Sequence, residues 1–282
     1  MFKRIQVLYP ELFKIGPFTI HSFGLMMALG FIVASYFLTK EIKRKGYDPN
    51  IGSTITLLAV VFGLAGSKIL FLIEEWKYFI KDPIGEAFSP AGLTWYGGFF
   101  LATLAIYIYS RKKKVPFLVI CDAAAPALLI GYGIARIGCH LSGDGDYGIP
   151  TDLPWGAQYS NGTYPPSVAF RHFPEIVEKY GVNGVVPDTI RVHPTPIYEF
   201  ILSTILFLIL WKNKEKIHQN GMMFMIYLIL YGTMRLLVEI IRINPRILFG
   251  LTEAQIISII IIIIGFTGIY FIKKAKKITP HH

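Results

Sequence analysis

The sequence predicts an all-α polytopic membrane protein with seven transmembrane helices, an N-terminus outside the membrane and a cytoplasmic C-terminus. Three observations lead to this fold class. Hydrophobic residues make up 53% of the 282 residues, the mean hydropathy is +0.50, and charged residues amount to only 16%. A soluble globular chain carries about 25% charged residues. This deficit excludes a disordered chain, a coiled coil and most soluble enzymes.

Seven apolar stretches are long enough to cross a bilayer, whose hydrocarbon core takes about 20 helical residues. In chain order they are residues 16–39, 51–73, 93–110, 115–139, 194–211, 221–241 and 251–272. The first has no small-residue cleavage site behind it, so we expect a retained helix rather than a removed signal. The last is the plainest, because residues 256–264 are almost unbroken isoleucine. We therefore expect residues 1–282 to form a single transmembrane domain.

Positive charge predicts which way these helices face. Lysine and arginine concentrate in three short loops, 40–50, 111–114 and 212–220, and in the tail after residue 272. By the positive-inside rule these segments are cytoplasmic. The segments on the opposite face carry fewer positive residues over a greater length: 1–15, 74–92, 140–193 and 242–250. Membrane topology thus explains the net charge of +10, and nucleic acid is not expected as a partner.

The long connection 140–193 is the one sizeable part predicted outside the membrane. It is rich in Gly, Pro and Asp, so we expect turns that lie over the outer ends of the helices as an extracytoplasmic cap. The spans show no inverted repeat, which gives no support to a transporter built from duplicated halves. Without a large soluble domain, any chemistry takes place in or beside the bilayer.

Ionisable residues inside the spans are costly, by about 2.5–3.5 kcal/mol each on insertion scales, so each one needs a reason. A helix rises about 1.5 Å per residue, which converts position in a span into depth. Seven polar residues then fall in the outer third of the membrane: His21, Lys68, Tyr96, Arg136, Glu199, Arg235 and Glu239. Asp122 falls on the inner side, where we expect it to cap or orient its helix.

Most of these residues, taken alone, also have a structural interpretation. Lys68 would extend to the outer headgroups. Arg235 and Glu239, spaced i, i+4, would neutralise each other along one helix face. His21 and Tyr96 would anchor their segments at the membrane interface. Separate roles do not explain why cations from three helices share one depth with two glutamates.

The convergence instead favours a binding site. Clustered cations in a low-dielectric layer repel one another unless an anion joins them. Two glutamates offset part of the charge, and the abundant anion at headgroup depth is phosphate, which arginine binds bidentately. The sequence therefore predicts an outward-facing, membrane-embedded site for a phospholipid headgroup. Gly97 and Gly98 are further candidates, although small residues also let membrane helices pack closely.

The segments around this expected site follow a distinctive order along the chain. They are Ile20–Leu25, Trp95–Gly98, Ala135–Cys139, His193–Glu199, Tyr231–Arg235 with Glu239 and Arg242, and Thr252 with Gln255. In order, spacing and seven-span layout, this set resembles the bacterial prolipoprotein diacylglyceryl transferase family over nearly the whole chain.

The resemblance implies a multi-pass enzyme of the bacterial inner membrane whose active site faces the outer leaflet. Such an enzyme moves the diacylglyceryl group of phosphatidylglycerol onto the lipobox cysteine thiol of a preprolipoprotein and releases glycerol 1-phosphate. This is the first step of lipoprotein maturation. Besides these substrates and membrane lipids, no metal and no organic cofactor are expected.

The resemblance also implies roles for residues. Arg136 and Arg235 match the two arginines that the family uses at the phosphate, Glu239 matches its sixth-span acid, and Tyr96 matches a position occupied by His or Tyr. Asp144 completes the catalytic candidates. The substrate-binding candidates are Arg136, Arg235, Lys68, His21, His140, Glu199, Gly97 and Gly98. Asp144, His140 or Glu199 could act as the general base, and the sequence does not choose among them.

The chain departs from the family pattern within the site itself. Ala135 stands where the family has Gly, Cys139 where it has Asn, Phe23 where it has Tyr and Lys68 where it has Arg. An extra residue precedes Gly148. Two alternatives therefore stay open: a membrane transporter of a lipid or small anion, and a divergent family member with an altered donor or acceptor.

Overall fold

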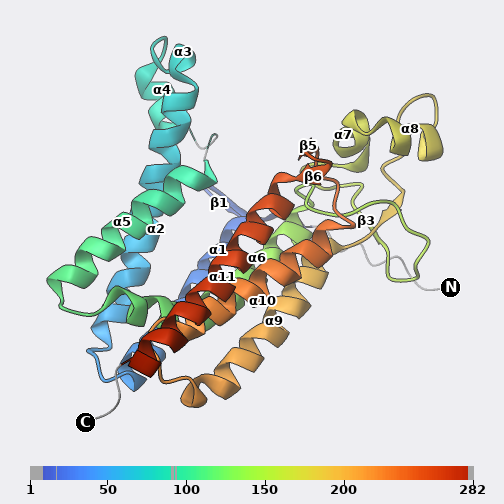
Figure 1. The fold of residues 1–282 in the computed structure, drawn as a ribbon. Helices are drawn as coiled ribbons and strands as arrows, with labels where there is room; N and C mark the ends of the chain where they lie inside the picture. Colours follow the sequence, from blue (N-terminus) through green and yellow to red (C-terminus); the bar gives the residue numbers. More distant parts are fainter. Residues whose placement is uncertain (1–8, 17, 90–91, 93, 279–282) are drawn as a thin grey trace. The chain divides into compact units, whose positions relative to one another are not determined.

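The computed structural model describes residues 9–16, 18–89, 92 and 94–278, without the side chains of 276–278 (Figure 1). Residues 1–8 of the predicted outer segment, residue 93 at the start of the predicted third span and the side chains of Lys276 and Lys277 lie outside the described part. The chain divides into two compact units. Unit 1 takes in residues 1–33 and 125–282, and unit 2 takes in residues 34–124.

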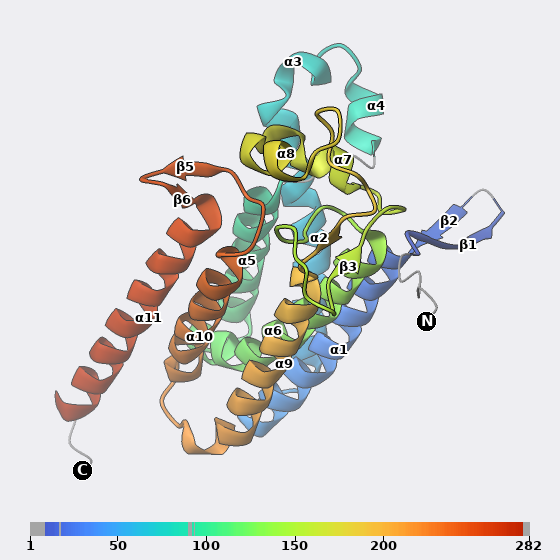
Figure 2. The ribbon, with the colours of Figure 1, turned by 90° about the vertical axis from the view of Figure 1, so that its right-hand side faces the viewer.

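Unit 1 contains the first part of α1 (Ser22–Arg44), most of α6 (Phe117–Ser142) and all of α9 (Thr195–Asn213), α10 (Met222–Glu239) and α11 (Glu253–Ile278). Figures 1 and 2 show α10 between α9 and α11. A short 3-10 helix, η2 (Lys214–Lys216), follows α9. Helix α11 begins at a capping box in which Thr252 and Gln255 each accept the backbone N–H of the other.

Two antiparallel hairpins precede helices of this unit. Strands β1 (Glu11–Ile15) and β2 (Phe18–His21) pair directly before α1, and β5 (Arg246–Leu248) and β6 (Leu251–Thr252) pair directly before α11. The predicted helix over 16–39 is therefore wrong for residues 18–21, whose alternating apolar and polar side chains suit a strand. His21 accordingly ends a strand, directly before the first helix that is long and apolar enough to span a membrane.

The cap over 140–193 has a small core of its own as well as the expected turns. It contains α7 (Pro166–Ala169), η1 (Phe170–His172), α8 (Pro174–Tyr180) and the paired strands β3 (Ala157–Gln158) and β4 (Arg191–Val192). Its buried core consists of Tyr147, Tyr159, Ala169, Phe170, Val186 and Val192. The rings of Tyr147 and Tyr159 stack with their centroids 4.5 Å apart. Tyr147 and Val192 of this core lie near the two ends of the segment that joins α6 to α9.

Unit 2 contains the rest of α1 and the start of α6, with α2 (Asn50–Glu74), α3 (Trp76–Phe79), α4 (Pro83–Phe88) and α5 (Trp95–Lys112). Helices α2 and α5 approach closely at Gly66 and Gly97, since a Cβ on Gly66 would lie 2.3 Å from the Gly97 carbonyl oxygen. Asp122 is fully buried and lies 3.3 Å from Lys45 Nζ, as expected for a residue that orients its helix.

Six described helices are long and apolar enough to cross a membrane: α1, α2, α6, α9 with η2, α10 and α11. They coincide with six of the predicted spans and confirm a mainly helical, polytopic membrane protein. The predicted third span, 93–110, is also helical as α5, but the polar residues at its ends, such as Arg111 and Lys112, keep it outside this set. The seven-span topology stays a prediction.

Candidate functional site

Glu199 lies at the centre of a buried charge cluster in unit 1. It sits in the second turn of α9, and its side chain has no solvent exposure. Its Oε1 accepts hydrogen bonds from Arg235 Nη1 at 2.6 Å and from Tyr132 Oη at 2.8 Å. Its Oε2 lies 3.1 Å from Arg136 Nε and 3.3 Å from Arg242 Nη1. Side chains from α6, from α10 and from the residues after α10 thus meet on one carboxylate.

Helical spacing directs these groups into the cluster. Tyr132 and Arg136 are four residues apart on α6 and share a face, and the guanidinium carbon of Arg136 lies 4.8 Å from the centre of the Tyr132 ring. Arg235 and Glu239 have the same spacing on α10, and Arg235 Nη2 lies 3.0 Å from Glu239 Oε2. Each helix therefore contributes a pair of neighbouring polar side chains.

The loop after α6 adds a second carboxylate, that of Asp146. Its Oδ2 pairs with Arg136 Nη1 and its Oδ1 with Arg242 Nη2. Thr195 Oγ1 donates to the backbone oxygen of Asp146 at 2.5 Å, which ties the loop to the start of α9. Burial alone would raise the pKa of the Asp146 carboxyl, but Arg242 and Arg136 outweigh it and hold the pKa at about 2.

Glu239 connects the cluster to the start of α11. Its side chain is buried, and its Oε1 accepts from Thr252 Oγ1 and from Asn244 Nδ2, each at 2.7 Å. Its Oε2 faces Arg235 and lies 3.8 Å from Arg242 Nε. Because Thr252 also caps α11, one hydroxyl serves both the helix end and the cluster.

The cluster is electrically balanced. Among the described residues of unit 1 it joins three guanidinium groups to three carboxylates, those of Arg136, Arg235, Arg242, Asp146, Glu199 and Glu239. The predicted excess of positive charge is therefore wrong for this cluster. The reason is the carboxylate of Asp146. This residue lies in a loop, so its depth could not be estimated from its position along a helix.

Three further residues lie at the end of α6 or just after it. Burial, together with the nearby Asp146 carboxylate, raises the pKa of Asp144. His140 Nδ1 lies 2.7 Å from Tyr159 Oη in the cap. Ligand atoms of Cys139, Asp144 and Asp146 lie within 4.8 Å of one another, but two arginines already neutralise Asp146, which disfavours a cation there. The expectation that no metal or cofactor takes part stays a prediction.

Four predicted site residues belong to unit 2: Lys68, Tyr96, Gly97 and Gly98. Lys68 Nζ donates to the Ser89 carbonyl oxygen at 3.0 Å. Tyr96 is 39% exposed, and the two glycines lie against α2, where close helix packing accounts for them. His21 lies in unit 1 and is exposed at the end of β2. The roles of these five residues in binding stay predictions.

Three residues of the cluster are missing from the predicted site residues: Tyr132, Asp146 and Arg242. Arg242 follows Arg235 by seven residues and Glu239 by three, a spacing that continues one helix face. Tyr132 precedes Arg136 by one turn. The sequence offers the least indication that Asp146 belongs to the site, because an acidic residue in a glycine-rich segment is typical of a turn.

Comparison with known proteins gives a consistent result over nearly the whole chain. The family model for prolipoprotein diacylglyceryl transferase matches residues 10–271. A phosphatidylglycerol–prolipoprotein diacylglyceryl transferase from Clostridium tetani is 32% identical over 258 residues, which is 91% of this chain and 94% of that protein. The matched region contains every residue of the charge cluster.

Two more relatives with that name show the same extent of similarity. The protein from Leptospira interrogans is 30% identical over 315 residues, covering 93% of this chain and 90% of its own length. The protein from Dehalococcoides mccartyi is 32% identical over 272 residues, covering 95% of this chain and 94% of its own length.

Proposed function

The chain belongs to the prolipoprotein diacylglyceryl transferase family, and we propose that it transfers the diacylglyceryl group of phosphatidylglycerol to a prolipoprotein. The observation that carries the proposal is the family match over residues 10–271, which includes Arg136, Glu199 and Arg235. The acceptor atom is the thiol sulfur of the lipobox cysteine in the signal peptide. The reaction begins the maturation of a bacterial lipoprotein.

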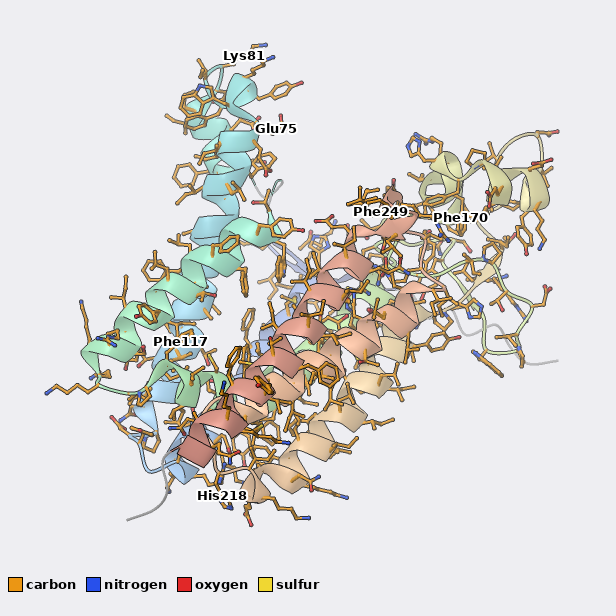
Figure 3. All side chains as sticks on the ribbon, viewed as in Figure 1. Glu75, Lys81, Phe117, Phe170, His218 and Phe249 are labelled. Carbon is orange, nitrogen blue, oxygen red and sulfur yellow. The ribbon has the colours of Figure 1, made fainter. Side chains whose placement is uncertain are left out.

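We further propose that the enzyme crosses the inner membrane seven times, with its N-terminus outside and its active site open to the outer leaflet. The six apolar helices and the basic loops support this topology. In unit 1, Figure 3 shows His218 of the basic 212–220 loop at the opposite end from Phe170 of the cap and Phe249 of the β5–β6 hairpin. The charge cluster adjoins the cap, which favours the outer side.

The proposed reaction exchanges bonds at one glyceryl carbon. The acceptor thiolate attacks this carbon and forms the C–S bond. The C–O bond to the phosphate breaks, and its electron pair leaves with glycerol 1-phosphate. Arg136 and Arg235 stabilise the charge that develops on the leaving phosphate. Glu199 holds both guanidinium groups in place beforehand, and such preorganised donors are most effective where water is excluded.

The thiol proton needs an acceptor, and we propose Asp144 among the three candidates. Both oxygens of Glu199 are engaged by guanidinium groups, and His140 Nδ1 is within hydrogen-bond distance of Tyr159. The raised pKa of Asp144 makes its carboxylate a stronger base than that of an exposed aspartate. Tyr96 is proposed to act as an orienting hydrogen-bond partner, and Lys68 is proposed to assist the headgroup.

Reconstitution tests the proposal directly. The purified chain is placed in liposomes that contain phosphatidylglycerol, a lipobox peptide is added, and mass spectrometry searches for thioether-linked diacylglycerol. The proposal predicts this product with the wild-type chain and its loss with Arg136→Ala. Movement of the lipid without covalent change would indicate a transporter, and product formed only with another donor lipid or acceptor peptide would indicate a divergent family member.

A further inference from the structure

Asp146 differs from the other two carboxylates of the cluster because solvent can reach it. The side chains of Glu199 and Glu239 are fully buried, whereas 32% of the Asp146 side chain is exposed. Asp146 also lies on the loop after α6 and not on a helix. Replacing its carboxylate by another anion would leave Glu199 and Glu239 in place.

The contacts of Asp146 resemble those of a bound phosphate. Its two carboxylate oxygens pair with two different guanidinium groups, those of Arg136 and Arg242. A phosphate can bridge two arginines in the same way, with one oxygen on each, through charge-assisted hydrogen bonds. The carboxylate therefore occupies the position that an anionic headgroup would take between these arginines.

Charge balance favours exchange over addition. The three guanidinium groups are already matched by three carboxylates, and a phosphodiester brings one more negative charge. Adding that charge to a balanced, largely buried cluster is unfavourable, because it would bury a charge without a matching counter-charge. Exchanging it for Asp146, which carries the same charge, keeps the balance.

The exchange needs a side-chain rotation and no movement of the loop. The backbone of Asp146 is held at both ends, since its carbonyl oxygen accepts from Thr195 Oγ1 at 2.5 Å and its N–H donates to Asp144 Oδ1 at 3.3 Å. A change of rotamer moves the carboxylate from the arginines toward solvent on its exposed side.

We propose that Asp146 is an internal substitute for the substrate phosphate, which holds Arg136 and Arg242 in place until the lipid phosphodiester displaces it. This inference rests on the proposed function and deepens it by adding Arg242 to the phosphate-binding groups. Return of the Asp146 carboxylate to the two arginines then competes with glycerol 1-phosphate and promotes its release.

The test measures binding of glycerol 1-phosphate to the full-length chain in detergent by calorimetry. Asp146→Asn removes the competing charge, so it should bind about tenfold more tightly than the wild type. Asp152→Asn is the matched control, because it makes the same charge change at an exposed position of the cap, and its affinity should equal that of the wild type. Unchanged or weaker binding by folded Asp146→Asn would overturn the inference.

A second measurement uses the unaltered chain, in case Asp146→Asn does not fold. A water-soluble carbodiimide and an amine label accessible carboxylates, and peptide mapping reads the labelling of Asp146. Saturating glycerol 1-phosphate should increase this labelling, and equal or lower labelling would overturn the inference. If the wild type forms the thioether product while both results are negative, the transferase proposal stands and the exchange is wrong. If the wild type forms no product and binds no glycerol 1-phosphate, the transferase proposal and the proposed exchange at Asp146 are both wrong.

Discussion

Arg136 and Arg235 form ion pairs with the two different oxygens of one buried carboxylate, that of Glu199. Arg235 Nη1 lies 2.6 Å from Oε1, and Arg136 Nε lies 3.1 Å from Oε2. The two arginines come from α6 and α10, so Glu199 on α9 fixes the distance between them. A reaction that needs two guanidinium groups at one leaving group depends on this arrangement.

Glu199 should be essential to the stability of the fold. Glu199→Gln leaves three largely buried guanidinium groups with one carboxylate too few, and breaking a buried ion pair in this way costs about 3–5 kcal/mol. Thermal unfolding in detergent should show a clear fall in Tm. The matched control is Glu178→Gln at an exposed position of α8, which should change stability by no more than about 0.5 kcal/mol. Equal Tm values for the two variants would argue against a central role for Glu199.

The Asp146 ion pairs should make stability depend on acid pH. The pKa of this carboxyl is about 2 in the folded chain, against an ordinary value of 3.8. A lowered folded pKa gives stability that is fully present above the ordinary value and is lost as pH falls through the folded value. Between about pH 4 and 2, Tm should therefore fall more steeply for the wild type than for Asp146→Asn. Parallel curves would contradict these ion pairs.

Asp144 should control the acid side of the pH–rate profile. As general base it acts only when ionised, so kcat/KM should fall as pH drops below its raised pKa. Asp144→Asn should be slower at neutral pH and should lose this acid limb. If Asp144→Asn keeps the acid limb of the profile, whatever its absolute rate, another group accepts the thiol proton.

Thr252 should affect both α11 and the cluster. Thr252→Ala removes the N-cap hydroxyl and one donor to Glu239, which should cost about 1–2 kcal/mol and lower Tm. Thr252→Ser retains the hydroxyl and should stay near the wild type. If the Ala and Ser variants unfold together, the hydroxyl is not what stabilises this end of α11.

The sequence predicted the helices well because membrane spans have a simple physical signature. Apolar length located six helices that are long and apolar enough to cross a membrane, within six residues of their observed bounds. The failure at residues 18–21 has an equally simple cause. Apolar content alone does not separate a short strand from the start of a helix, whereas the alternation of Phe18, Thr19 and Ile20 does.

Depth along the spans also brought together residues that the structure joins, namely Arg136, Glu199, Arg235 and Glu239. The estimated depth of a residue in the membrane could not show which residue neutralises its charge. Asp146 enters the cluster from a loop, and its position depends on the cap core and on Thr195, which are long-range contacts. The unit 1 cluster shows no positive excess for that reason, since one loop carboxylate changes its net charge.

The measurement that tests the central claim most directly is the rate of diacylglyceryl transfer to a lipobox peptide by the arginine variants. Arg136→Ala and Arg235→Ala should each lower the rate per folded molecule by about 10²-fold or more. Arg171→Ala, at an exposed position of the cap, is the matched control and should stay near the wild-type rate. Transfer by both cluster variants at the rate of the Arg171→Ala control would contradict a phosphate site at Arg136 and Arg235.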